Sequence, residues 1–248
     1  MLLVIRIHEV FEKFIADSIH SVENPPEWRL SHDSYRHIAH DYARVAKGYL
    51  FLGNSLDKAM QYYERSCDCY LKHLKLGECF SSTAYDAMIT SILSRKSDTI
   101  DAMIAQLGKE FPFREGHGEG GYSYHLSPLI FSVLYRKNNP NLYTNYLTKF
   151  LEKEEELTKH CSGLNMGDGM AIQSIIDRNF EDFLAVIEKI IRFDIRSLPQ
   201  CLDLPISIRA TYLIFLARDQ GMNLSNDILK KRFKETHQGL IRQTLLMA

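Results

Sequence analysis

Hydrophobic and polar residues follow one another along most of this chain with the spacing of an α-helix. From about residue 3 to residue 21, apolar side chains recur every three or four positions and form one stripe, made of Val4, Ile7, Phe11, Phe14 and Ile15. No convincing run of strict alternation, which would indicate a β-strand, interrupts this pattern. The sequence therefore predicts an all-α fold.

Proline and glycine divide the N-terminal part into three predicted helices. Pro25 and Pro26 end the first one, because proline cannot continue a helix. The second runs from near Ser31, an N-cap type of residue, to about Leu52, and a Gly-Asn-Ser turn at 53–55 precedes the third. The expected inner face of the third helix consists of Leu56, Ala59, Met60, Tyr63, Cys67, Tyr70, Leu71 and Leu74.

A short pattern then recurs about every 41 residues, and each copy is expected to end a helix. It reads Ser-Ile-Leu-Ser-Arg at 91–95, Ser-Val-Leu-Tyr-Arg at 132–136 and Ser-Ile-Ile-Asp-Arg at 174–178, with a degenerate fourth copy at 214–218. The arginines of these copies, Arg95, Arg136, Arg178 and Arg218, are interpreted as helix-ending cations that favour the negative end of the helix dipole. A ladder of arginines along one face is the less favoured alternative.

The helices that follow three of these turns share one apolar spacing. Positions i, i+3, i+4 and i+7 are apolar in each, as Ile100, Met103, Ile104 and Leu107, then Tyr143, Tyr146, Leu147 and Phe150, then Phe183, Val186, Ile187 and Ile190. A last pair is expected over about 205–220 and from 225 to near the end of the chain, with Gly221 as a C-cap. This period is typical of stacked helix pairs, none of which buries its apolar face alone.

We therefore predict a tetratricopeptide-like or HEAT-like stack of antiparallel helix pairs, with about 10–12 helices in a single domain over 1–248. Within it, 1–80 would hold the N-terminal helices, 81–195 the repeat units and 196–248 the C-terminal capping helices.

Composition and charge narrow the function. The formal net charge is −1 and the basic residues are scattered, which argues against a nucleic-acid partner. No apolar run approaches the ~18 residues of a membrane span, and Arg6 breaks the apolar start of the chain, so we expect a cytoplasmic protein without a signal peptide. The five cysteines lack metal-site spacing and are expected to be reduced and buried.

The densest polar cluster covers residues 31–41. His37 and Asp41 are four residues apart on a helix, and His40-Asp41 is similar to the doublet of all-helical metal-dependent phosphohydrolases of the HD type. Such a site would also need an upstream histidine, for which His8 and His20 are available, and a distant aspartate, for which Asp86 and Asp98 are available. A solvated helix N-terminus is the favoured interpretation, and no metal, cofactor or catalytic residue is predicted.

The glycine-rich stretch at 114–125 has neither the lysine nor the serine or threonine at the positions that a phosphate-binding loop requires. It is interpreted as a connection that lengthens one repeat. Alternatively it protrudes and contacts a partner, for which the candidate residues are Arg114, Glu115, His117, Glu119, Tyr122 and Tyr124. The acidic run at 152–156 is expected to be a solvated helix face, with a patch for a basic toxin or nuclease as its alternative.

Several segments resemble the bacterial immunity proteins of polymorphic toxin systems, in particular immunity-protein family forty-nine. The resemblance is carried by Tyr-Ala-Arg-Val-Ala-Lys-Gly-Tyr at 42–49, the aromatic helix at 62–74, the segment from Ala-Tyr-Asp-Ala-Met at 84–88 to Leu107, and the stretches 202–205 and 216–222.

The resemblance implies a non-enzymatic inhibitor that binds a cognate interbacterial toxin, delivered by a type VI or contact-dependent system, and blocks its active site or locks an inactive form. It supplies no toxin-binding residues. A tetratricopeptide-like adaptor that holds a peptide or protein in its groove is the second hypothesis, and the metal-dependent phosphohydrolase is the third. An apolar groove or the first helix could also pair two copies, so a homodimer stays open.

Overall fold

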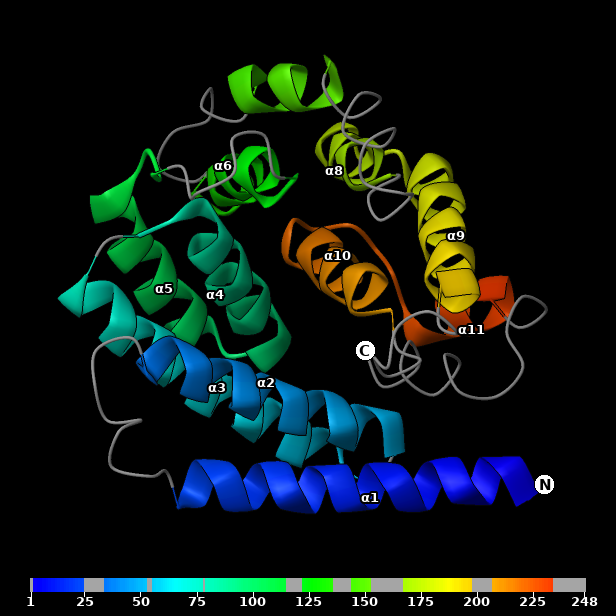
Figure 1. Cartoon of the computed structure of the whole chain (residues 1–248). Helices are drawn as coiled ribbons and strands as arrows, with labels where there is room; N and C mark the ends of the chain where they lie inside the picture. Colours follow the sequence, from blue (N-terminus) through cyan, green and yellow to red (C-terminus); the bar gives the residue numbers. More distant parts are fainter. Residues whose placement is uncertain are drawn as a thin grey trace. The chain divides into compact units, whose positions relative to one another are not determined.

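The computed structural model describes residues 2–24, 34–52, 55–77, 79–114, 122–135, 144–152, 167–197 and 207–233. All regular secondary structure in these ranges is helical, which confirms the all-α prediction, and helices pack in pairs (Figure 1). One isolated parallel bridge joins Phe80 and Arg114. The chain forms two compact units: unit 1 comprises Met1–Cys79 and Asp86–Phe111, and unit 2 comprises Phe80–Tyr85 and Pro112–Ala248. The single domain remains a prediction.

Unit 1 is organised around two long helices that pack side by side. Its helices are α1 (Leu2–Glu23), α2 (Ser34–Leu52), α3 (Leu56–Leu76), most of α4 (Ser81–Ser94) and α5 (Ser97–Glu110). α2 packs along α3, α1 lies on α2, and α5 contacts α3. Side chains also join the helices, since the Ser66 hydroxyl donates to the Ala39 carbonyl at 2.7 Å and the Gln106 amide to the Leu74 carbonyl at 3.3 Å.

The inner face of α3 follows the apolar periodicity of the sequence. Of the predicted residues, Ala59, Tyr63, Cys67, Tyr70 and Leu74 are buried, while Leu56, Met60 and Leu71 are half-buried. The buried face also contains Ser66, Cys69 and His73, which the apolar pattern did not identify. The stripe is therefore wider than its hydrophobic members indicate.

The cysteines of the described ranges are buried thiols, as predicted: Cys67, Cys69 and Cys79. Burial raises the pKa of the Cys69 thiol to about 11 and that of Cys79 to about 12, so both are protonated and unreactive at neutral pH. Cys161 and Cys201 lie outside the described residues.

Unit 2 contains α6 (Tyr122–Leu134), a helix over residues 144–152, α8 (Asp168–Asp177), α9 (Phe180–Ser197), α10 (Ile208–Asp219) and α11 (Asn226–Phe233). α8 packs against α9, and α10 contacts both. Every residue of α10 from 210 to 217 is buried, which is the behaviour of a helix that is apolar on all sides. α6 begins at Tyr122, about one turn before the predicted start at Leu126.

The repeated serine has one role in all three copies of the sequence pattern. Ser91 donates its hydroxyl to the Met88 carbonyl at 2.8 Å, Ser132 to Leu129 at 2.7 Å and Ser174 to Met170 at 2.8 Å. All three serines are buried. Each serine is small, and its hydroxyl is hydrogen-bonded to a carbonyl of its own helix. Neighbouring helices can therefore pack closely against it without burying an unpaired hydroxyl.

The repeated arginines end helices through their backbone conformation. Arg95 has φ of 57° and Arg178 has φ of 55°, the left-handed region normally occupied by glycine. After α8, the Asn179 N–H bonds to the Ser174 carbonyl and the Arg178 N–H to the Ile175 carbonyl, which is the Schellman pattern.

The fourth copy of the pattern ends its helix differently. Gly221, at φ of 87°, takes the left-handed position after α10, as its predicted C-cap role requires. Arg218 therefore lies inside α10, where its guanidinium donates to the Leu224 carbonyl and the Asn226 side chain. Arg136 lies outside the described residues.

Replacing Arg178 with glycine is expected to stabilise unit 2 by about 0.5 to 1 kcal/mol, because glycine adopts a positive φ without the steric cost borne by a side chain. Urea denaturation measures the change. Arg218→Gly is the matched control, and it is expected to destabilise by at least about 1 kcal/mol because it places glycine inside a helix and removes two hydrogen bonds. If both variants changed the free energy of unfolding in the same direction, this assignment of helix ends would be wrong.

Candidate functional site

The predicted contact loop is only partly described. Arg114 is exposed, and its carbonyl accepts hydrogen bonds from the Ser81 N–H at 3.0 Å and the Ser81 hydroxyl at 3.1 Å. Glu115, His117 and Glu119 lie outside the described residues. Tyr122 and Tyr124 belong to α6 rather than to a loop, and the positions of their side chains are outside the description. Their partner-binding role stays a prediction.

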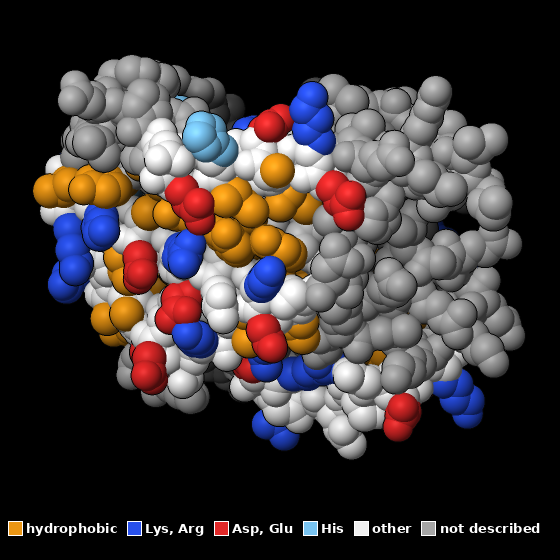
Figure 2. All heavy atoms as spheres, turned by 90° about the horizontal axis from the view of Figure 1, so that it is seen from below, with side chains coloured by type: hydrophobic (Ala, Val, Ile, Leu, Met, Phe, Trp, Pro, Cys, Tyr) orange, Lys and Arg blue, Asp and Glu red, His pale blue; other side chains and the backbone are white. Residues whose placement is uncertain are grey.

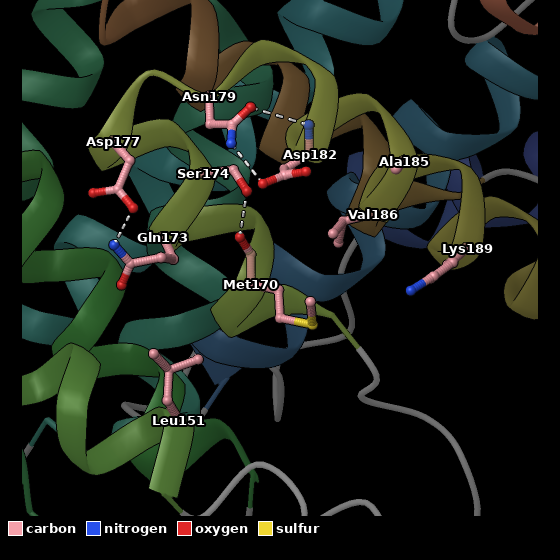
Figure 3. Close-up of a pocket in the computed structure, with 10 residues that line it drawn as sticks. All are labelled: Leu151, Met170, Gln173, Ser174, Asp177, Asn179, Asp182, Ala185, Val186 and Lys189. Atoms are coloured by element: carbon pink, nitrogen blue, oxygen red, sulfur yellow. Dashed lines mark hydrogen bonds between the residues drawn. The ribbon is translucent and has the colours of Figure 1, made fainter.

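A groove in unit 2 runs between α8 and α9 (Figure 3). The α8 wall consists of Met170, Gln173, Ser174 and Asp177, and the α9 wall of Asp182, Ala185, Val186 and Lys189. Asn179 lies at the turn between the helices, and Leu151, from the helix over 144–152, completes the lining. We call this surface the α8–α9 groove. Its volume is about 320 Å³, near the lower end of the ~300–1,000 Å³ range of ligand-binding pockets.

Both walls of the groove follow a single helical stripe. On each helix, the lining residues occupy positions i, i+3, i+4 and i+7, which share one face of an α-helix. The short turn after Arg178 sends α9 back along α8, so the C-terminal end of one stripe lies beside the N-terminal end of the other. Asp177 and Asp182 therefore lie at the turn, whereas Met170 and Lys189 lie at the opposite end (Figure 3).

Neighbouring amides hold the two aspartates at the acidic end of the groove. Gln173 donates to the Asp177 carboxylate at 2.5 Å, and Asn179 donates to Asp182 at 2.5 Å (Figure 3). Each of these bonds occupies one carboxylate oxygen. The Asn179 side-chain oxygen in turn accepts the Asp182 N–H at 3.3 Å and caps α9. The acidic end is thus fixed in position by Gln173 of α8 and Asn179 of the α8–α9 turn.

The apolar part of the groove comprises the Met170 side chain, at the Lys189 end, and the floor between the two ends. Met170 is 50% exposed and is one of two large hydrophobic side chains with such exposure in the described ranges, the other being Leu76 at 60%. Val186 and Ser174 are buried and form the floor, while Ala185 is half-buried. The small side chains on the floor let a partner approach the helix backbones closely.

The apolar periodicity of the sequence identified only one side of α9. The quartet Phe183, Val186, Ile187 and Ile190 is buried, as predicted. The groove stripe lies beside this quartet and shares Val186 with it, but its other members are small or charged. The signal that could have identified it is the pair of i, i+3, i+4, i+7 stripes on either side of the Arg178 turn, each with an aspartate next to that turn.

A polar network links α8, α9 and α10. Asp168, at 0% exposure, accepts hydrogen bonds from Arg209 at 2.6 Å and from the Tyr212 hydroxyl at 2.8 Å. Arg209 also reaches Asp194 of α9 at 3.5 Å, and the Ser207 hydroxyl donates to Asp194 at 2.5 Å. Burial raises the pKa of Asp194, although Arg209 and the Ser207 hydrogen bond oppose that rise. We call these five residues the Asp168 network.

Unit 1 carries a second cluster of charged residues, on α2. Arg36, His40, Arg44 and Lys47 occupy one face of that helix. His40 Nε2 lies 3.6 Å from Asp86 Oδ2, and the Tyr70 hydroxyl lies 3.4 Å from His40 Nδ1. Burial and the nearby cations, Arg36 first among them, lower the pKa of His40 to about 4. Burial raises the pKa of Asp86 to about 6, although Arg36 and Lys47 lower it.

This arrangement brings together only part of the phosphohydrolase ligand set. His40 does lie beside Asp86, but Asp41 forms an ion pair with Arg44 at 3.5 Å. His20 is exposed near the end of α1, and the structure does not describe the His8 side chain. Across the described residues, no three His, Cys, Asp or Glu side chains converge in a way that could hold a metal ion. The phosphohydrolase therefore remains the third hypothesis.

The two pKa shifts have opposite effects on stability. Because the pKa of His40 is lowered, the unfolded chain binds more protons at this site between about pH 4 and pH 6.5, so its contribution rises with pH and is lost as the pH falls. Because the pKa of Asp86 is raised from 3.8 to about 6, the folded chain binds more protons at Asp86 between these two pH values, so this contribution falls as the pH rises. The two contributions oppose each other between about pH 4 and pH 6.

Single variants should separate these contributions. In Asp86→Asn, only the histidine remains, so we expect the free energy of unfolding to rise more steeply between pH 4 and 6.5 than in the wild type. In His40→Gln, only the contribution of Asp86 remains. The free energy of unfolding of this variant should therefore fall with rising pH, relative to that of the wild type, between pH 4 and 6. Urea denaturation at intervals of half a pH unit measures both curves. Variant curves parallel to that of the wild type would contradict the shifts.

The surface in Figure 2 carries both signs of charge. Lysine, arginine, aspartate and glutamate side chains are interspersed around a band of hydrophobic side chains, and no large area of one sign is visible among the coloured atoms. In unit 1, Tyr62 stacks on Tyr49 with ring centroids 5.5 Å apart, and Arg65 lies 5.2 Å from the Tyr62 ring centre. The mixed signs argue against electrostatic attraction of a polyanion to this face.

Comparison with known proteins adds no relative. No family model matches the chain, and no match was found among curated proteins or solved structures. In the described ranges, no helix combines the length and the apolar character that crossing a membrane requires.

Proposed function

We propose that this chain is a non-enzymatic binding protein that holds a protein partner in the α8–α9 groove. One observation carries the proposal: the groove combines an exposed methionine and an apolar floor with charged groups of opposite sign at its two ends. Exposed apolar surface with polar residues at its edges is typical of protein interaction sites. Methionine adapts its shape to a partner, while the charges restrict which partners fit.

The class of partner comes from the resemblance to immunity-protein family forty-nine. On that basis, the partner is a cognate interbacterial toxin, delivered by a type VI or contact-dependent system and neutralised in the cytoplasm by direct binding. No chemical step by this chain is needed, because occupying the active site of the toxin is sufficient for inhibition.

Co-expression tests this function. The gene immediately upstream is induced in a laboratory bacterium with and without this protein, and the pair is then purified by affinity pull-down. We expect growth to be restored and a one-to-one complex to be recovered. A neighbour that kills despite this protein, or that is harmless and does not bind it, would contradict the toxin assignment and leave the adaptor hypothesis in first place.

Two matched variants connect the function to the groove. Met170→Glu places a charge on the apolar part of the groove, and we expect it to abolish both rescue and pull-down. Leu76→Glu makes the same change at the other highly exposed hydrophobic side chain, on α3 of unit 1, and we expect it to retain both. Because both side chains are at least half exposed, neither change should unfold the protein, which far-UV circular dichroism verifies. Loss of rescue in Leu76→Glu alone would place the partner on unit 1 instead.

A further inference from the structure

The form of the α8–α9 groove restricts the segment that it can hold. We infer that it takes an amphipathic α-helix of the partner, aligned antiparallel to α9, with an acidic residue at one position, apolar residues three and four positions later, and a basic residue seven positions later. This inference rests on the proposed function, since it specifies the part of the partner that enters the groove.

The repeat of the lining residues is the first argument. Both walls present residues at i, i+3, i+4 and i+7, so chemically distinct groups follow each other along the groove at helical intervals. A third helix laid between two such stripes matches that interval on both sides, whereas an extended strand repeats every two residues and does not. From Asp182 to Lys189 the distance along α9 is about 10 Å, at roughly 1.5 Å per residue.

Charge complementarity is the second argument. A basic side chain of the partner fits the end with Asp177 and Asp182, whose carboxylates are already oriented by Gln173 and Asn179. An acidic side chain fits Lys189 at the other end. These partner groups must also be about 10 Å apart, which a helix achieves with seven residues. Apolar side chains between them cover Val186 on the floor and the exposed Met170 at the Lys189 end.

The helix dipole decides the direction. A helix favours acidic residues near its N-terminus and basic residues near its C-terminus. A partner helix with its glutamate first and its arginine seven residues later therefore has the more favourable internal electrostatics. Placing that glutamate against Lys189 and that arginine against Asp182 makes the partner antiparallel to α9.

Two designed peptides test the inference against the full-length protein. The matched peptide is an alanine-based 18-residue helix with Glu at i, Leu at i+3 and i+4 and Arg at i+7, labelled with fluorescein at one end. The reversed peptide exchanges Glu and Arg and is otherwise identical. We expect fluorescence anisotropy to show the matched peptide binding at least tenfold more tightly, with a preference that weakens as salt is added.

Charge-exchange variants of the protein provide the control. The double variant Asp182→Lys/Lys189→Asp should prefer the reversed peptide, and the single variant Lys189→Glu should remove the preference if the double variant does not fold. Equal affinities of the wild type for both peptides, or no binding of either up to 1 mM, would overturn the inference. If the protein rescues growth from the toxin but does not discriminate between the peptides, only this inference is wrong. If it discriminates between the peptides but does not rescue growth, only the toxin assignment is wrong.

Discussion

Replacement of Asp168 by alanine is expected to lower the free energy of unfolding by about 3 to 5 kcal/mol, the largest effect among the variants described. The change leaves Arg209 in a position where it is only 16% exposed, without the carboxylate that lies 2.6 Å away in the wild type. Arg209 still reaches Asp194, at 3.5 Å, but its largely buried charge retains its desolvation penalty and forfeits most of the attraction that offset it. The Tyr212 hydroxyl loses its acceptor at the same time. Urea denaturation measures the loss.

A double-mutant cycle distinguishes loss of the charge pair from loss of packing. Arg209→Met keeps much of the length of the side chain without its charge, so Asp168→Ala/Arg209→Met should be less destabilised than the sum of the two single variants. Arg192→Ala is the matched control on α9, since it removes an exposed ion pair with Glu188 and should change stability by no more than about 0.5 kcal/mol. Equal costs for Asp168→Ala and Arg192→Ala would show that the network contributes no more than a surface pair.

Disruption of the Asp168 network should also affect binding. Asp168 belongs to the first turn of α8, and the groove residues Met170 and Gln173 follow it on that helix. The Asp168 network connects this turn to α9 and α10, so its loss should let α8 shift relative to α9. We therefore expect Arg209→Met to weaken partner binding under conditions in which the protein is still folded, although Arg209 is not part of the groove.

Helical periodicity was sufficient to predict most of the fold. Apolar residues at intervals of three and four placed α1, α3 and α9, and the recurring pattern placed the ends of α4 and α8 at Arg95 and Arg178. These features are local, because burial of one helix face constrains residues close together in sequence. The early start of α6 was not predicted, since residues 122–125 neither favour nor oppose a helix strongly.

The candidate site could not be predicted in the same way. Asp168, Asp194 and Arg209 are separated by up to 41 residues, and no spacing rule connects polar residues that meet only through the packing of three helices. The groove stripes are local in sequence, but their charged and small residues resemble an ordinary solvated helix face. Their meaning depends on the two stripes facing each other across the α8–α9 turn, which is a property of the folded unit.

Replacement of Gly48 by alanine is expected to cost about 1 to 3 kcal/mol, because α1 lies directly against this residue. A Cβ atom at position 48 would lie 2.4 Å from Ile15 Cγ1 and 2.6 Å from Ile15 Cδ1, well inside van der Waals contact, and Ile15 is itself buried. Either Ile15 leaves its rotamer or α1 moves away from α2. Hydrogen exchange should accordingly accelerate in α1 more than in α3, and urea denaturation gives the overall cost.

Size exchange tests whether contact with Ile15 is the cause. In Gly48→Ala/Ile15→Ala, the isoleucine atoms that the new Cβ would meet are gone. The double variant should therefore lose less unfolding free energy than the two single variants lose together. Gly108→Ala is the matched control, because Gly108 is exposed within α5 and alanine there should stabilise the helix by about 0.5 to 1 kcal/mol. Equal gains at positions 48 and 108 would mean that α1 does not pack on α2 at this glycine. A cost at position 48 that Ile15→Ala removes would show that the missing side chain of Gly48 is what allows the two helices to approach.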